Sequence, residues 1–306
     1  MRRRRVVLLL LGCLLLAAVV LSIRPKSHEP VYQGRRLSQW LVLFVDAPIA
    51  GQLEASNAVC AIGTNALPWL MNRIQHEASP SRWAKWVALG RKLPGRMGRS
   101  LNALLADDLD FQMQLTQTGF RLLGPAARSA IPELSQTLRG ADPNASARAA
   151  AVMRYLGPEA LEPLLSVVQD HNEAIGTRIG AVSALRYMGY LGADGASAVP
   201  VLLSCLKETN RVVCFMAAQS LGNFALEPEL VVPALTNHTQ SLDPFIRRFS
   251  VRALGQFGSN AAVALPLVQK ALGDSDKRVR SEATNALGKI APELSRTPTA
   301  VQGDRR

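Results

Sequence analysis

The four histidines are the side chains in this sequence best suited to binding a transition metal, and they are scattered along the chain. They are His28, His76, His171 and His238. A protein zinc site takes ligands that lie a few residues apart or that converge in the fold. No two of these histidines have such a spacing, so we expect no metal site and no bound cofactor.

A carboxylate cluster is the next candidate for chemistry. Asp107, Asp108 and Asp110 lie close together in the sequence. Adjacent positions on a helix point in different directions, so these carboxylates are poorly placed to act as an acid–base pair. We interpret them as capping a helix that begins near Phe111. The sequence also has no phosphate-binding glycine loop and no nucleophile elbow, and we predict that the protein is not an enzyme and has no catalytic residues.

The cysteines do not indicate reactive chemistry either. Cys13 lies in an apolar N-terminal run, and Cys60, Cys205 and Cys214 lie in apolar helical contexts. Cys205 and Cys214 flank one predicted turn and could form a disulfide in an oxidising compartment. Buried, unpaired thiols are the interpretation that their surroundings favour.

A repeated phrase ending in glycine organises most of the chain. It reads FRLLG, MRYLG, LRYMG, AQSLG, VRALG and TNALG, and it ends at Gly124, Gly157, Gly189, Gly222, Gly255 and Gly288. Successive glycines are about 33 residues apart, and a fixed period of this size indicates an array of stacked helical units.

Positions around each glycine show what a unit requires. The residue before the glycine is always apolar, and the fifth residue before it is small in every repeat but one, where it is Val152. These two positions are four residues apart and so lie on one helical face, which predicts close packing of a neighbouring helix. The glycine itself suits the left-handed conformation that ends a helix.

A second helix follows each glycine. It is marked by a proline and an apolar residue two positions later, at Pro132, Pro163, Pro200, Pro233 and Pro266. Proline is favoured in the first turn of a helix. Each unit is therefore predicted to be two helices of about 12 residues joined by a glycine turn. Polar breaks separate the units, and we interpret them as helix N-caps, with an acidic binding ladder as the alternative. They contain Asp142, Asp170, Asn210, Asp243, Asp274 and Asp276.

The phrases resemble the HEAT-repeat family, in particular its short bacterial variety with bilin-lyase-type repeats. DKRVRSEATNALGKI (276–290) is similar to the first helix of that family and GSNAAVALPLVQKAL (258–272) to its second. The resemblance covers 111–294 and implies an all-α solenoid of stacked antiparallel helix pairs. A further unit with Gly63 and Pro68 is expected within 47–110, followed by an irregular basic stretch that is a degenerate or interrupted unit.

The same resemblance brings two enzyme alternatives. Deoxyhypusine hydroxylase has a related array and binds iron through His-Glu dipeptides from several repeats. Here the only such dipeptides are His28-Glu29 and His76-Glu77, outside the regular repeats. Bilin lyases are the other relatives, and nothing beyond the repeats indicates a tetrapyrrole pocket. Both enzymes are kept as alternatives to a binding function.

The N-terminus predicts a membrane anchor at 1–23. Four arginines precede an unbroken apolar run from Val6 to Ile23. The length of that run is near the minimum for crossing a bilayer, and the arginines favour a cytoplasmic N-terminus. The repeat domain would then be extracytoplasmic, and periplasmic in a Gram-negative bacterium. A cleaved signal peptide and a lipoprotein modified at Cys13 are the alternatives.

A linker at 24–30 leads to a predicted capping helix at 31–46. Leu37, Trp40, Leu41 and Phe44 recur on one helical face, and the segment resembles the opening found ahead of HEAT arrays in membrane-anchored bacterial proteins. A solenoid needs such a cap over its first apolar face. A helix lying on the lipid surface is the alternative. At the other end, the polar segment 295–306 is expected to be a disordered tail.

One stretch before the regular repeats is strongly basic and carries two tryptophans. It could contact anionic headgroups or could be a solvated face of a diverged repeat. The candidate headgroup-binding residues are Arg82, Trp83, Lys85, Trp86, Arg91, Lys92, Arg96 and Arg99.

A scaffold that binds a protein or peptide on the solenoid surface is the predicted function. The candidate contacts are arginines near the starts of first helices, namely Arg148, Arg178, Arg211, Arg247, Arg248 and Arg280. Nucleic-acid binding is an alternative because the net charge is +12. The basic residues of segment 1–26 account for half of that charge, and together with the extracytoplasmic orientation this argues against a nucleic-acid partner.

Overall fold

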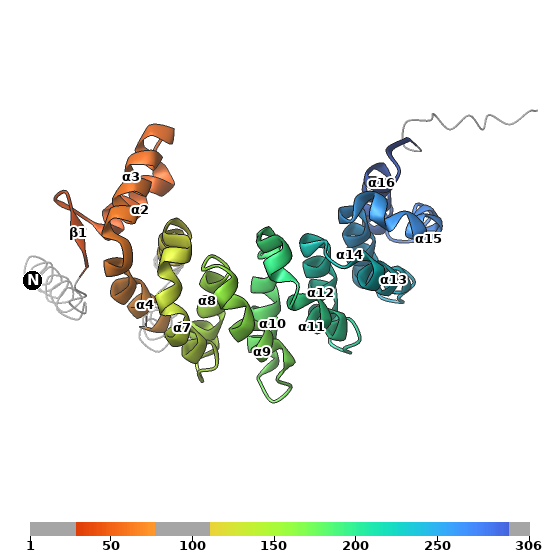
Figure 1. The fold of residues 1–306 in the computed structure, drawn as a ribbon, viewed down its shortest axis with the longest axis horizontal. Coiled ribbons are helices and arrows are strands. Elements are labelled where there is room, and N and C mark those ends of the chain that lie inside the picture. The colour runs from red at the N-terminus through yellow and green to blue at the C-terminus, as the bar shows by residue number, and fades with distance from the viewer. Residues whose placement is uncertain (1–28, 77–110, 294–306) are drawn as a thin grey trace, which may run out of the picture.

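A computed structural model describes residues 29–76 and 111–293, which form an arc of stacked helix pairs (Figure 1). The all-α solenoid predicted from the repeat is confirmed. The described part begins with a small antiparallel hairpin and three helices: β1 (Val31–Tyr32), β2 (Arg35–Arg36), α2 (Leu37–Asp46), α3 (Ile49–Ile62) and, after the 3-10 turn Gly63–Ala66, α4 (Leu67–His76). A helix over 111–123 follows.

The repeats alternate between first and second helices. After 111–123, the first helices are α8 (Pro143–Met153), α10 (Ile175–Leu185), α12 (Arg211–Phe224), α14 (Pro244–Gln256) and α16 (Lys277–Ile290). The second helices are α7 (Ile131–Leu138), α9 (Leu161–Gln169), α11 (Ala198–Cys205), α13 (Pro228–His238) and α15 (Leu265–Ala271). They contain 7 to 11 residues. They are shorter than predicted because 3-10 turns occupy part of four of the connections.

The two sets of helices form two layers. First helices line the inner, concave side of the arc and second helices the outer side (Figure 1). We call the helix 111–123 with α8, α10, α12, α14 and α16 the inner helices, and α7, α9, α11, α13 and α15 the outer helices. The apolar core lies between the layers, where three of the residues that precede repeat glycines, Leu156, Met188 and Leu254, are fully buried.

The repeat glycines do not all end helices, and this part of the prediction is wrong. Gly124 and Gly157 have positive φ angles of 51° and 97° and do end their helices. Gly222, Gly255 and Gly288 lie inside α12, α14 and α16. A Cβ at Gly222 would lie 2.7 Å from the Cα of Ala253, and one at Gly255 would lie 2.9 Å from the Cα of Ala286. These two glycines therefore allow consecutive inner helices to approach backbone to backbone.

We expect Gly222→Ala to lower the free energy of unfolding by about 2 kcal/mol, because the new methyl group overpacks a contact with helix backbone. Gly176→Ala is the matched control. It lies in α10, and no atom lies within 4 Å of its added Cβ. That change should be neutral or slightly stabilising, since alanine has the higher helix propensity. Equal stability of both variants in urea titrations would show that the close approach at Gly222 is not required.

The polar breaks act as N-caps at four places, as predicted. The side chains of Asp142, Asn210, Asp243 and Asp276 accept hydrogen bonds from backbone N–H groups of α8, α12, α14 and α16. Asp170 differs, because its carboxylate accepts from the N–H of Asn172 in a turn, and α10 begins only at Ile175. The prediction that a proline marks the first turn of each second helix is wrong at Pro233. This proline lies inside α13, which already begins at Pro228.

The expected capping helix is shorter than 31–46 because its first six residues form the hairpin. Gln33 and Gly34 have positive φ angles and make the turn, and α2 begins at Leu37. The indole N–H of Trp40 donates to the carbonyl of Tyr32 at 3.1 Å, which joins helix and hairpin. Leu37, Trp40 and Leu41 are buried, whereas Phe44 is half-buried and faces a hollow described below.

The first unit packs directly on the helix 111–123. The Arg73 guanidinium of α4 donates to the hydroxyl of Thr116 at 3.1 Å, and a Cβ at Gly119 would lie 2.8 Å from Leu70. Gln75 of α4 also donates to Glu133 of α7 at 2.8 Å. The two flanking units are thus neighbours in the stack. The degenerate or interrupted unit expected between them falls on residues 77–110, outside the described residues.

Several predictions fall outside the described residues. They concern the anchor at 1–23, most of the linker 24–30, the basic candidates between Arg82 and Arg99, and the tail 295–306. A membrane-spanning helix is not found among residues 29–76 and 111–293.

Candidate partner-binding site

Charge is separated between the two layers of the solenoid. The six inner helices contain eleven lysines and arginines and a single acidic residue, Glu282. The five outer helices contain three glutamates and one lysine. The inner helices are therefore rich in cations. Five of their arginines pair with carboxylates, four of which lie in the turns just before inner helices. The arginines divide into those that hold the stack together and those that lie closer to the surface.

Arg178 belongs to the stack. Its side chain is 6% exposed, its Nε donates to the carbonyl of Val168 at 2.9 Å, and its two terminal nitrogens donate to the Glu208 carboxylate. Arg148 is also buried, and its Nε donates to the carbonyl of Ile74 at 2.8 Å. Both side chains are buried and hydrogen-bonded within the stack, which gives them a structural role.

Arg247 links two successive units in the same way. Its Nε and one terminal nitrogen donate to the Asp274 carboxylate at 2.8 and 2.7 Å, and it also donates to the carbonyls of Ser241 and Leu242. The hydrogen bonds from Arg247 lower the pKa of the Asp274 carboxyl below its usual value of 3.8. The ionised carboxylate thus stabilises the fold, and Arg247 is also a stack-forming arginine.

We expect Asp274→Asn to lower the free energy of unfolding by about 2 kcal/mol at pH 7, the range for hydrogen bonds between charged groups. Because the pKa of Asp274 is depressed in the folded chain, its contribution is complete above pH 3.8 and is lost as the pH falls through the folded value. The difference between wild type and variant should therefore shrink below about pH 4. A constant difference from pH 7 to pH 3 in denaturant titrations would contradict this role.

Arg211, Arg248 and Arg280 remain closer to the surface. The Arg211 side chain is 49% exposed, pairs with Asp243 at 2.8 Å and stacks over the Phe245 ring at 4.0 Å. Arg248 pairs with Glu282 at 3.2 Å. Arg280 is exposed and donates to the carbonyls of Asp274 and Ser275. These three are the members of the predicted set that a partner can still contact.

Aromatic side chains accompany these surface arginines on α12 and α14. Phe215 stacks on Phe249 with ring centroids 4.9 Å apart and lies 6.3 Å from Phe245. All three rings are half-buried. The inner side therefore presents apolar surface beside positive charge, a combination that is typical of protein interfaces.

A second row of cations crosses the ends of the inner helices, and the sequence prediction missed it. Arg154 lies over the rings of Tyr155 and Tyr187, at 4.7 and 4.5 Å, and donates to Gln117 at 3.2 Å. Arg186 lies 4.5 Å from the Tyr187 ring and donates to Gln219 at 3.0 Å. These contacts connect successive inner-helix ends to one another. The signal was present in the repeat, because arginine is the third residue before the glycine in FRLLG, MRYLG, LRYMG and VRALG.

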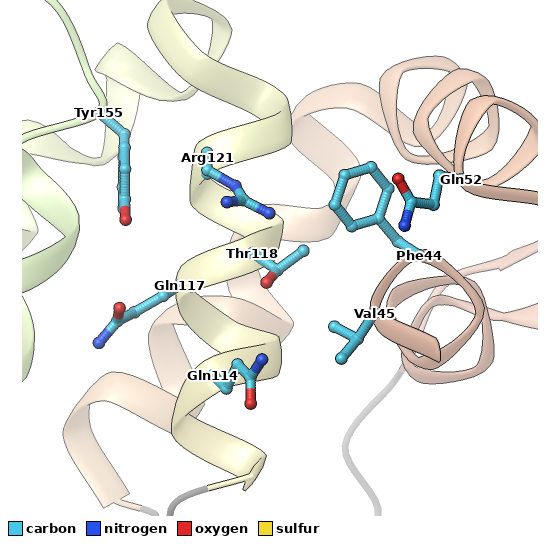
Figure 2. A pocket seen from close by; sticks show the side chains of 8 residues that line it. All are labelled: Phe44, Val45, Gln52, Gln114, Gln117, Thr118, Arg121 and Tyr155. Atoms are coloured by element: carbon cyan, nitrogen blue, oxygen red, sulfur yellow. The ribbon is translucent and has the colours of Figure 1, made fainter. Parts of the chain in front are cut away.

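A hollow of about 480 Å³ lies at the N-terminal end of this row. Phe44 and Val45 of α2 and Gln52 of α3 form one wall, and Gln114, Gln117, Thr118 and Arg121 form another (Figure 2). The Arg121 guanidinium lies 5.4 Å from the Phe44 ring, and Tyr155 stands across the hollow (Figure 2). The lining is polar with a single cation, which suits recognition of a polar or anionic group.

The reactive side chains of the described residues do not gather at this site. Cys205 and Cys214 are unpaired and buried, and burial raises their thiol pKa values to about 12 and about 11. Across residues 29–76 and 111–293, no three His, Cys, Asp or Glu side chains are placed to share a metal ion.

The chain belongs to the HEAT-repeat family, the class of protein that this stack defines. The family model for HEAT repeats matches residues 131–222, 199–287 and 232–302, together more than half of the chain. No curated protein sequence matches this chain.

Solved structures resemble the chain more distantly. The complex of CpcE and CpcF of phycocyanin lyase from a Nostoc species is 24% identical, with a TM-score of 0.43, over 54% of this chain and 66% of that chain. A designed armadillo repeat protein in complex with the peptide (KR)4 is 15% identical, with a TM-score of 0.44, over 83% and 99%. Human deoxyhypusine hydroxylase is 18% identical, with a TM-score of 0.35, over 83% and 94%.

Proposed function

We propose that this protein is a membrane-tethered scaffold that binds a protein partner along its inner helices. The observation that carries the proposal is the separation of charge, eleven basic residues against one acidic residue on the inner helices. Solenoids present extended concave surfaces to partners. The half-buried rings of Phe215, Phe245 and Phe249 add apolar contact area there.

Binding, and not catalysis, is the function that the side chains support. The buried thiols of Cys205 and Cys214 have strongly raised pKa values and stay protonated at neutral pH. The hollow between α2 and the helix 111–123 is lined by glutamines, one threonine, one arginine, one tyrosine and apolar residues. None of these forms a nucleophile–base pair.

Site-specific photocrosslinking tests where the partner binds. A photoreactive amino acid is placed at Ala147, Gln219 or Arg252 on inner helices, and at the exposed outer positions Gln136, Glu162 or Lys270. In native membranes, the inner positions should give a discrete protein adduct and the outer positions should not. Adducts of equal yield from both layers, or from the outer layer alone, would rule out the inner helices as the binding surface.

The proposed tether is the segment 1–23. It is supported by the apolar run from Val6 to Ile23 behind four arginines, which favours a spanning helix with a cytoplasmic N-terminus. The full-length chain should remain in membranes after alkaline extraction, and a cysteine at the C-terminal end should be labelled by an impermeant reagent from the extracytoplasmic side. Release by alkali would contradict the tether.

The basic stretch from Arg82 to Arg99 is proposed to contact anionic headgroups next to that tether. Six basic residues and two tryptophans lie within it without an acidic residue, and each cation near a charged membrane surface contributes about 1 kcal/mol. Changing the six basic residues to glutamine should weaken binding of the chain lacking residues 1–23 to phosphatidylserine vesicles. Equal binding to neutral and anionic vesicles before the change would contradict it.

A further inference from the structure

The cations at the ends of the inner helices are held by neutral groups. Arg154 is held by Gln117 and the hydroxyl of Tyr155, and Arg186 by Gln219 and the hydroxyl of Tyr187. Lys289 donates to Gln256 at 2.5 Å. Tyrosine and glutamine orient a cation without supplying a negative charge of their own.

Two further cations extend this row. Arg121 lies over the Phe44 ring, and Arg252 is exposed near the end of α14. Among residues 29–76 and 111–293, none of these five cations has a carboxylate within 4.0 Å. The row thus differs from the stack-forming arginines Arg178 and Arg247, whose charges are each paired with a carboxylate. We define the helix-end row as Arg121, Arg154, Arg186, Arg252 and Lys289.

Four of the five members of the row come from equivalent positions in the repeat, and Lys289 instead follows Gly288. Arg121, Arg154, Arg186 and Arg252 each precede a repeat glycine by three positions, and Gln219 takes this position in α12. Packed helices are about 8–10 Å apart. An extended peptide advances about 3.3 Å per residue, so every third side chain advances about 10 Å. Acidic side chains at every third position would therefore meet Arg121, Arg154 and Arg186 in turn and, after the gap at Gln219, the cations of α14 and α16.

We infer that the partner's docking segment is an extended acidic polypeptide with a carboxylate at about every third residue, bound along the helix-end row. The inference rests on the proposed function, a scaffold whose inner helices bind a protein partner. The hollow beside Arg121 and Tyr155 marks the N-terminal end of the binding track. From there the segment runs across the ends of α8 and α10 toward α14 and α16.

The test uses the full-length chain in nanodiscs of neutral lipid and fluorescein-labelled peptides of equal length. The probe is (Glu-Gly-Ser)5. One control replaces every glutamate with glutamine, and another collects the five glutamates at one end, which keeps the net charge. By fluorescence anisotropy at low salt, the spaced peptide should bind and the glutamine peptide should not. The clustered peptide should bind at least about threefold more weakly, because its carboxylates cannot reach successive cations.

Variants locate the binding to the row. The triple change Arg121→Gln, Arg252→Gln and Lys289→Gln removes three exposed cations of the row and should weaken the spaced peptide about tenfold. The matched control removes three exposed cations elsewhere, by Arg128→Gln, Lys207→Gln and Lys270→Gln, and should change affinity less than about twofold. Unchanged circular dichroism and thermal midpoints confirm that both triples fold.

Three results would overturn the inference. They are equal loss of affinity in the two triple variants, no binding of the spaced peptide, and tighter binding of an oligo(dT) of matched length than of the spaced peptide. If inner-helix photocrosslinks form while the spaced peptide fails to bind, only the acidic-segment inference is wrong. If the inner-helix crosslinks are absent as well, the proposed function itself is wrong.

Discussion

Replacing Arg178 with alanine is expected to lower the free energy of unfolding by about 3 kcal/mol. The change removes a nearly buried guanidinium from Glu208, whose own side chain is only 18% exposed, and leaves that carboxylate without its partner. It also leaves the carbonyl of Val168 without the hydrogen bond from Arg178 Nε. An unpaired buried charge costs far more than the pair contributes. Urea titration followed by circular dichroism measures the effect.

Arg128→Ala is the matched control for this prediction. Arg128 also pairs with a glutamate of the following unit, Glu159, at 3.2 Å, but the two side chains are 67% and 47% exposed. Exposed ion pairs contribute little, so this change should cost less than about 0.5 kcal/mol. If Arg178→Ala and Arg128→Ala had equal effects, Arg178 would not be a stack-forming residue, and its role as a partner contact would return.

Trp40→Ala is expected to destabilise the chain by about 3–5 kcal/mol, the range for removing a large aromatic side chain from a core. Trp40 is 1% exposed, and its N–H is the link between α2 and the hairpin. Its loss would open a cavity beneath the first unit and uncover the end of the apolar core. Thermal unfolding of the full-length chain in detergent measures the change.

Trp40→Phe separates the two contributions of this side chain. Phenylalanine keeps an aromatic ring in the core but loses the hydrogen bond to the Tyr32 carbonyl and part of the apolar contact, so a loss of about 1–2 kcal/mol is expected. Tyr190→Ala, at a ring that is 61% exposed, should cost less than Trp40→Ala by a wide margin. A mild effect of Trp40→Ala would mean that the solenoid does not depend on its N-terminal cap.

The period of the glycines was sufficient to predict the stack, because one supersecondary unit repeated at a fixed interval admits few architectures. The conformation of each glycine could not be read from the sequence. Gly124 and Gly222 occupy the same repeat position, yet the first has a positive φ and the second lies in a helix against Ala253. The distinction depends on how far the helix continues and on which neighbour approaches it, and both are tertiary effects.

The candidate site was predicted only in part. The sequence directed attention to arginines at the starts of the inner helices, and Arg178 and Arg247 proved to be committed to Glu208 and Asp274, the carboxylates that precede the next inner helix. Such pairing between neighbouring units requires knowledge of which side chains meet across the stack. The helix-end arginines could be recognised from the repeat. Their tyrosine and glutamine partners, which distinguish them from the carboxylate-paired arginines, could be found only in the structure.

Hydrogen–deuterium exchange of the full-length chain, with and without the crosslinked partner, tests the central claim most directly. Binding along the inner helices predicts slower exchange in peptides from the C-terminal halves of α8, α10, α12 and α14, with the outer helices α7, α9, α11 and α13 unchanged. Protection confined to the outer helices, with the inner helices unaffected, would contradict the account.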